Sequence, residues 1–198
     1  MNKPNNLLSF FNAEPIIGLD IDKNHVRLAS AFINSDGKVV VDKLGSLEYD
    51  SGASQEEVAS SLKRLWRDKH IKTHTVQSCL RSQSIITKYF KLPTVLREEV
   101  DSALRLEAEQ VFQKPPEEIF IDWHLYSSNN QLNKEKHNSS EGFFVAALAK
   151  DINKHLSILQ KADLYPVIVD VGCMAISNLF LALESFSKTE SVCLVSVN

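Results

Sequence analysis

The stretch "IIGLDIDKNHVRL", residues 16–28, decides how the chain begins. An apolar run reaches one acid at Asp20, and a second acid follows at Asp22. Acids in this position fit three kinds of structure: the first phosphate-binding turn of a nucleotide-binding fold, a metal-binding acid pair, or simply the end of a buried strand. The rest of the chain has to separate these alternatives.

The order of elements around this stretch predicts an α/β fold. Three strand-like segments come first, at residues 16–21, 26–33 and 38–47. The turn "NSDG" joins the second and third as an antiparallel hairpin. A helix follows, with a capping box made by Ser54 and Glu57, and "THTVQSCL" is the next strand. Strand, strand, strand, helix, strand is the order of a ribonuclease H-like half-domain, in which the last strand lies parallel to the first.

A second unit interrupts this order. "SIITKYFKLP" predicts a strand, and a helix with an apolar stripe follows; the stripe is Leu96, Val100, Leu104 and Val111. Two more strands, "EIFIDWHLY" and "GFFVAALA", complete a strand-helix-strand-strand insertion. The expected organisation is an N-terminal segment at 1–14, the ribonuclease H-like part at 15–83 and 151–198, and the insertion at 84–150.

The last part of the chain is strongly apolar. "YPVIVDVG" and "SVCLVSV" read as continuous buried strands, and "CMAISNLFLAL" between them reads as a helix. Uninterrupted apolar strands are typical of the interior of a parallel sheet, so we expect both strands there.

Composition excludes several classes of function. The 198 residues carry a net charge of −3 with a pI near 6.1, and they contain no basic cluster, which argues against nucleic acid as a partner. No apolar run is as long as a membrane span, and the N-terminus is not a signal peptide. Three scattered cysteines are typical of reduced thiols in a cytoplasmic protein.

Four stretches together resemble a known family. "IIGLDIDKNHVRLA", "SQSIITKYFKLP", "LRLEAEQVFQKPPEEIFIDWHLY" and "LQKADLYPVIVDVGCMAI" match, in order and spacing, the type IV pilus assembly protein PilM family from about residue 15 to 198. The resemblance implies an actin-like fold related to FtsA, with the insertion of that group. It also implies a cytoplasmic role in which the protein meets the inner membrane through a partner, by binding the N-terminal tail of the membrane protein PilN.

The resemblance gives the opening stretch a meaning. In the family the strand leads into Asp-x-Gly and small hydroxyl residues, whose backbone amides hold a nucleotide phosphate. Here Asp20 matches, Asp22 replaces the glycine, and Lys23 and Asn24 replace the hydroxyl residues. A carboxylate ~4 Å from a phosphate charge is repelled by about 4 kcal/mol at an effective dielectric of ~20. We therefore expect a degenerate phosphate turn, no bound cofactor (ATP with magnesium being the one to test) and no enzymatic activity.

The resemblance also implies a groove for the PilN tail between the ribonuclease H-like part and the insertion. The crossover "CLRSQSIITKYF" and the insertion helix would line it. The candidate partner-binding residues are Leu80, Arg81, Ser82, Leu104 and Glu107. An apolar tail needs an apolar floor, which Leu104 would supply, and polar groups that fix its direction.

Three function classes remain open. The adaptor is the predicted function, and the alternatives are an actin-like ATPase that needs a second half and a metal-dependent nuclease that uses Asp20 with Asp170. If the chain ends at Asn198, the apolar runs near its end would either leave an exposed patch that favours self-association or form ordinary core.

Overall fold

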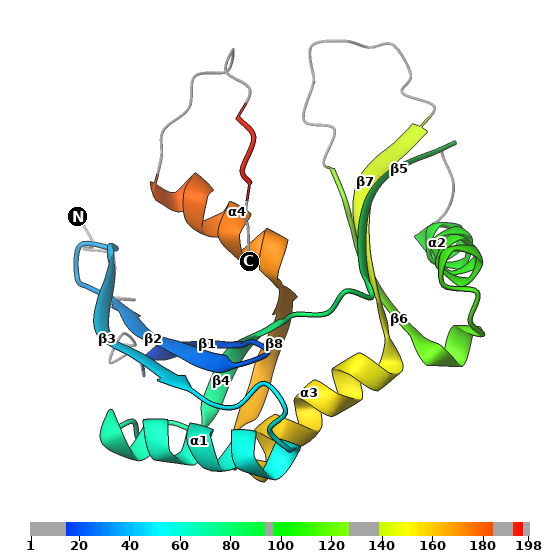
Figure 1. Cartoon of the computed structure of the whole chain (residues 1–198). Helices are drawn as coiled ribbons and strands as arrows, with labels where there is room; N and C mark the ends of the chain where they lie inside the picture. The colour runs from blue at the N-terminus through cyan, green and yellow to red at the C-terminus, as the bar shows by residue number, and fades with distance from the viewer. Residues whose placement is uncertain (1–14, 94–96, 127–138, 184–191, 196–198) are drawn as a thin grey trace, which may run out of the picture. The chain divides into compact units, whose positions relative to one another are not determined.

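The computed structural model describes residues 15–93, 97–126, 139–183 and 192–195. The chain divides into two compact units (Figure 1). Unit 1 takes residues 1–81 and 155–198, and unit 2 takes residues 82–154, where the sequence suggested 84–150 for the insertion. No helix in the described ranges has the length and apolar composition needed to cross a membrane.

Unit 1 is built on a five-stranded sheet in the order β3-β2-β1-β4-β8. Its strands are β1 (Ile16–Ile21), β2 (His25–Ile33), β3 (Val39–Glu48), β4 (Thr75–Leu80) and β8 (Tyr165–Val171). The first three form an antiparallel meander, β4 lies parallel to β1, and β8 lies parallel to β4. The expected ribonuclease H-like order, with the fourth strand parallel to the first, is confirmed.

Helices cover one face of this sheet. Helix α1 (Gln55–Asp68) begins at Ser54, whose side chain accepts from the amide of Glu57 while the Glu57 carboxylate accepts from the Ser54 amide. This capping box satisfies two backbone donors at the helix start. α1 and α3 (Ala149–Lys161) contribute to a core with alternate residues of the central strands. The buried residues of that core include Ile17, Leu19, Val26, Leu28, Leu62, Leu65, Trp66, Val76, Ile158 and Leu159.

Unit 2 has the predicted strand-helix-strand-strand order. Its elements are β5 (Ile85–Pro93), α2 (Arg97–Phe112), a 3-10 turn (Pro116–Glu118), β6 (Ile119–Leu125) and β7 (Ser139–Leu148). The strands form an antiparallel sheet in the order β5-β7-β6. Val100, Leu104 and Ala108 of α2 form a second core with Phe90 and Phe144 of the sheet.

One predicted stripe residue of the insertion helix, Val111, is not found in the core. Val111 is 53% exposed, and Ala108 takes its place in the buried stripe. Leu96 lies outside the described residues. Spacing alone missed this because Val111 and Ala108 are both compatible with helical periodicity.

The C-terminal strands differ most from expectation. Among the described strands, β8 lies at the edge of the sheet rather than in its interior, and Val167 and Ile168 are 64% and 50% exposed. Residues 192–195, expected in another buried strand, lie outside any helix or strand and are exposed. Helix α4 (Gly172–Leu183) does form where the sequence predicts it. An apolar strand is stable when other elements pack against it. The sequence of the strand does not show which elements those are.

A buried polar pair joins α3 to the sheet of unit 1. His155 Nε2 lies 2.7 Å from Ser78 Oγ, and these two side chains are 6% and 2% exposed. Burial lowers the pKa of His155 to about 4, against an opposing effect of the Asp20 charge. The imidazole is therefore neutral in the folded protein at neutral pH.

The buried pair makes stability depend on pH. The histidine of the unfolded chain has a pKa near 6.5. Below that pH the unfolded chain therefore binds a proton at His155, whereas the folded chain does not bind it until the pH approaches about 4. The stability contributed by neutral His155 is complete above pH 6.5 and is lost as the pH falls toward about 4. Urea unfolding should show a loss of about 2 kcal/mol between pH 7 and pH 5.

The control is His155→Gln, which keeps a hydrogen-bonding side chain without a titrating ring. Its free energy of unfolding should change much less over the same interval. Equal pH dependence in parent and variant would show that another group is responsible.

Candidate functional site

The turn after β1 is closed by its own backbone. The Asp22 amide donates to the His25 carbonyl at 2.9 Å, and the Lys23 amide donates to Asp22 Oδ1 at 2.7 Å. The Tyr49 amide donates to the Asn24 carbonyl at 2.8 Å, and the Tyr49 hydroxyl donates to the Asp22 carbonyl. A phosphate-binding turn offers its amide hydrogens to the ligand. Here the amides of Asp22 and Lys23 already have partners inside the protein.

Two arginines form ion pairs with the carboxylates of the turn. Arg81 Nε donates to Asp20 Oδ1 at 2.7 Å, and Arg81 Nη1 lies 3.5 Å from Asp22 Oδ2. Arg27 Nη1 donates to the other oxygen of Asp20 at 3.1 Å. Burial alone would lower the pKa of Arg81, but the hydrogen bond and charge of Asp20, with the charge of Asp22, raise it. The guanidinium is thus a fixed cation within the degenerate turn.

The same negative charges act on the tyrosine that closes the turn. Burial, followed by the charges of Asp22 and Asp20, raises the pKa of Tyr49 above its usual value. Its hydroxyl therefore stays protonated at neutral pH and remains a donor to the turn. His25 also faces the acids, with Nε2 3.5 Å from Asp22 Oδ2.

The predicted acid partner Asp170 lies two strands away from Asp20. Asp20 pairs in register with Cys79, and Cys79 pairs with Asp170, so the three residues form one row across β1, β4 and β8. Two interstrand spacings separate the acids by about 10 Å at Cα. Within the described ranges, no three His, Cys, Asp or Glu side chains are grouped to hold a metal ion. The nuclease hypothesis therefore gains no support from this row.

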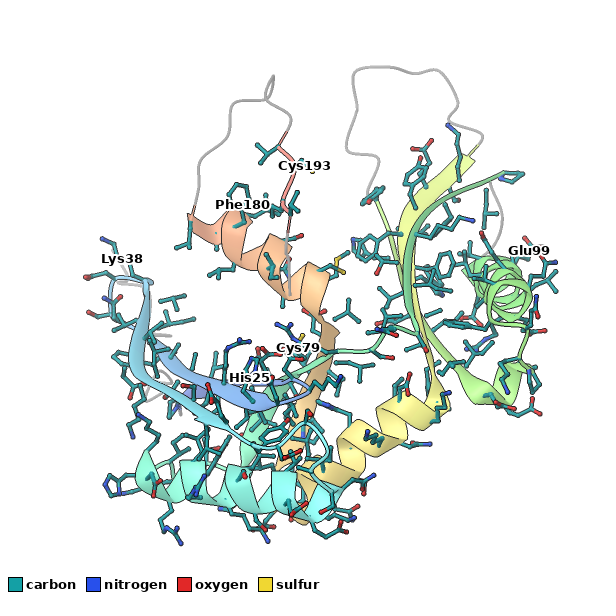
Figure 2. All side chains as sticks on the ribbon, viewed as in Figure 1. His25, Lys38, Cys79, Glu99, Phe180 and Cys193 are labelled. Atoms are coloured by element: carbon teal, nitrogen blue, oxygen red, sulfur yellow. The ribbon has the colours of Figure 1, made fainter. Side chains whose placement is uncertain are left out.

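Cys79 is unsuited to nucleophilic chemistry. Burial, and then the charge of Asp20, raise the pKa of this thiol to about 11. A thiol with that pKa is almost entirely protonated at neutral pH and is a weak nucleophile. Figure 2 shows Cys79 and His25 on the sheet of unit 1, at the end where β1 meets the turn.

The predicted partner-binding residues of unit 1 already have roles within it. Leu80 is 5% exposed and belongs to the buried residues of β4. Arg81 pairs with Asp20 and Asp22. Arg81 keeps 23% of its side chain exposed, so contact with a partner stays a prediction for this residue.

The three candidates of unit 2 are similarly engaged. Ser82 Oγ donates to Asp151 Oδ2 at 2.6 Å. Leu104 is 1% exposed in the core beneath the sheet, and Glu107 pairs with Lys88. Their part in partner binding also stays a prediction.

Sequence reasoning missed an aromatic surface on unit 2. The register places Tyr89 and His124 on either side of Phe143, on the sheet face opposite α2. Tyr89 and Tyr126 stack with ring centroids 6.3 Å apart, and Phe143 lies 6.1 Å from Tyr126 and 5.9 Å from His124. Tyr89 and Tyr126 are each 53% exposed. We call Tyr89, His124, Tyr126 and Phe143 the aromatic face.

Alternation along the strands could have revealed this surface. Phe143 and Phe144 are adjacent, so one must point away from the helix-covered side. Arg27 was missed for a similar reason. Its position opposite Asp20 follows from the hairpin register, which places Ile21 opposite Val26 and Asp20 opposite Arg27.

The described elements have the α/β, actin-like fold class that the sequence predicts. The chain matches the family "Type IV pilus assembly protein PilM" over residues 18–197. It therefore belongs to the PilM family. A search of curated proteins finds no match.

Solved structures of similar fold were also found. The chain is similar to PilM in the "PilM-PilN type IV pilus biogenesis complex", with a TM-score of 0.69 and 21% identity, over 82% of this chain and 48% of that one. It is also similar to the cytoplasmic domain of EpsL, an inner-membrane component of the type II secretion system of Vibrio cholerae, with a TM-score of 0.54 and 9% identity, over 79% and 57% of the two chains. The chain spans about half the length of these proteins.

The arginine network should contribute unequally to stability. Arg81→Ala leaves two half-buried acids without their inner cation, and we expect a loss of about 1–3 kcal/mol in the free energy of unfolding at pH 7. Arg27 is 52% exposed, so Arg27→Ala should cost less than about 1 kcal/mol. Urea unfolding of both variants measures the difference. Equal losses would contradict the central place given to Arg81.

Proposed function

We propose that this chain is a non-enzymatic adaptor of the type IV pilus assembly platform. It lies in the cytoplasm beneath the inner membrane and binds the cytoplasmic N-terminal tail of a PilN-type membrane protein. It is held at the membrane through that partner.

Membership of the PilM family is the observation that carries this proposal. The likeness to PilM solved in complex with PilN extends over both units, since it takes in 82% of the chain. A partner tail is the natural ligand to infer from such a complex. The match spans only 48% of that PilM chain, so the contacts with the tail are argued from the residues of this chain alone.

The closed turn supports the absence of enzymatic activity. A phosphate at this position would have to displace the internal partners of the Asp22 and Lys23 amides and approach two carboxylates. Arg81 and Arg27 cannot serve the phosphate without leaving Asp20 unpaired. Each of these changes costs free energy, whereas a turn whose amides are free to bind phosphate needs no such change.

The aromatic face is the surface of unit 2 that best suits a tail. Its rings offer apolar area and the edges and faces of π systems, and the Tyr89 hydroxyl is hydrogen-bonded to Glu141 beside them. Rigid aromatic side chains provide contact area at low entropic cost, which is why they dominate binding hot spots. We therefore place the tail against Tyr89 and Phe143.

Nucleotide binding by the 198-residue chain should be weak or absent. Isothermal titration with Mg-ATP at pH 7.5 is expected to give no saturable heat in the micromolar range. Asp22→Gly should improve binding only modestly, because Arg81 still pairs with Asp20. A micromolar dissociation constant for the parent chain would contradict the adaptor and favour an ATPase.

Tail binding should depend on the aromatic face. Fluorescence anisotropy with a labelled synthetic peptide of the PilN-type tail measures it. Tyr89→Ala is expected to weaken binding at least about tenfold, the usual effect of removing an aromatic anchor. Arg81→Ala and Glu107→Ala test separate contacts of the tail, because neither residue lies on the aromatic face; each should weaken binding several-fold without unfolding the protein.

Val111→Ala is the matched control, since this side chain is as exposed as Tyr89 but lies on α2. It should leave tail binding unchanged. If Tyr89→Ala, Arg81→Ala and Glu107→Ala all bind like the parent, these contacts are wrong. If the parent chain does not bind the tail at all, the proposed function is wrong.

A further inference from the structure

The second half of helix α1 and the loop after it concentrate positive charge. Residues 63–74 contain five Lys and Arg and one acid, Asp68, although the whole chain has 22 Lys and Arg against 25 Asp and Glu. The prediction from composition that the chain contains no basic cluster was therefore wrong for this stretch. We call its cations the α1 basic face; they are Lys63, Arg64, Arg67, Lys69 and Lys72.

The fold turns this face away from the core of unit 1. The apolar side of α1 packs in that core with Leu62 and Trp66. Lys63 and Arg64 are exposed, and Arg67 keeps 77% of its side chain in contact with solvent. Figure 1 shows α1 on the opposite side of the sheet from α4. Charged side chains are stable in water, so this surface needs no covering element.

The cations of the face are little neutralised inside the protein. Among the described residues, the one ion pair they make joins Arg67 Nε to Asp68 Oδ1 at 3.9 Å, and both side chains are exposed. Exposed pairs of this kind are weak. Lys63 and Arg67 are four residues apart and therefore neighbours on the helix surface, a like-charge arrangement that slightly destabilises a helix. The face thus carries an excess of positive charge.

The end of the helix accounts for only part of this charge. Cations stabilise the last turn of a helix, where carbonyl groups lack partners. Arg67 lies in that turn, and Lys43 of β3 donates to the His70 carbonyl just beyond it at 3.2 Å. Lys63 and Arg64 come before the last turn, so the same effect does not explain them. They are available to an external anion.

The chemistry of the face fits an anionic membrane surface. Clusters of about four to eight Lys and Arg on an amphipathic helix are typical of segments that bind anionic lipid headgroups, and each cation raises the affinity about fivefold. Proteins that bind single-stranded nucleic acid add exposed aromatic rings on which bases stack. The one aromatic side chain of α1, Trp66, is 6% exposed, and its Nε1 donates to the Thr73 carbonyl at 2.9 Å. The face therefore favours lipid over nucleic acid.

A cluster of this size binds a membrane only weakly by itself. The inferred partner is a membrane protein, whose tail would hold this chain beneath the bilayer. Tethering of this kind raises the effective concentration of the face at the lipid surface to about the millimolar range, so a weak contact is sufficient. In this step the inference rests on the proposed function.

We propose that the α1 basic face binds the anionic phospholipid headgroups of the inner membrane directly. The contact is electrostatic and reversible, because the residues that form it are all charged. It adds a second attachment to the one through the tail, and it orients unit 1 with α1 toward the membrane.

Vesicle flotation of the 198-residue chain, without any tail peptide, tests the proposal. The parent should float with phosphatidylcholine vesicles that contain about 30% phosphatidylglycerol, and it should not float with phosphatidylcholine alone. Binding should fall steeply as salt rises from about 0.05 to about 0.5 M. The double variant Lys63→Glu with Arg64→Glu should lower the partition coefficient at least about tenfold.

The matched control is the double variant Lys38→Glu with Lys150→Glu, which changes the net charge by the same amount. Lys38 lies at the tip of the hairpin between β2 and β3 (Figure 2), and Lys150 is exposed in the first turn of α3. This control should float like the parent. Circular dichroism of each variant separates loss of lipid binding from loss of the fold.

Four outcomes overturn the proposal. They are a parent that does not float with anionic vesicles at low salt, a Lys63→Glu with Arg64→Glu variant that floats like the parent, a control that loses as much binding as that variant, and binding of labelled single-stranded DNA without binding of vesicles. The last outcome would assign the face to nucleic acid.

Tail binding is measured separately, by fluorescence anisotropy in the absence of lipid. The parent and the Lys63→Glu with Arg64→Glu variant should bind the tail peptide equally, because the aromatic face belongs to unit 2. A parent that floats with anionic vesicles but does not bind the tail would contradict the proposed function and not the lipid contact.

Discussion

The ion pair between Arg81 and Asp20 closes the turn at the carboxyl end of β1. It joins the carboxyl ends of two parallel central strands, β1 and β4, at the point where the chain leaves for unit 2. It also supplies the cation that two acids in one turn require. Because the guanidinium lies against both acids, their charges are compensated within unit 1.

The uneven covering of the unit 1 sheet explains where interactions are available. One face packs its apolar residues against α1 and α3, and this core gives the unit its stability. Other side chains of the sheet stay exposed at both of its edges, among them Val39, Val41 and Leu44 on β3 and Val167 and Ile168 on β8. Unit 2 repeats this arrangement on a smaller scale, with α2 on one face of its sheet and the aromatic face on the other. In unit 2, the proposed surface for the tail is the sheet face that α2 does not cover.

The sequence predicted the element order well because that information is local. Ser54 and Glu57 fix the start of α1, the "NSDG" turn fixes a hairpin, and alternation fixes β6. The family-derived position of Asp22 in the turn was also predictable. The partners of the acids were not, because Arg81 is distant in sequence and its pairing depends on the parallel alignment of β1 with β4. The prediction that β8 is a buried interior strand was wrong for a similar reason. Whether a strand is buried depends on which elements pack beside it, and the composition of the strand does not give that information.

The most direct test of this account is a crystal structure of the chain grown with both the PilN-type tail peptide and a non-hydrolysable Mg-ATP analogue. The account predicts peptide density against Tyr89 and Phe143, with the Arg81 guanidinium still bonded to Asp20 and no nucleotide at the turn. A phosphate bound to the Asp22 and Lys23 amides, with Arg81 displaced and no peptide on the aromatic face, would contradict it.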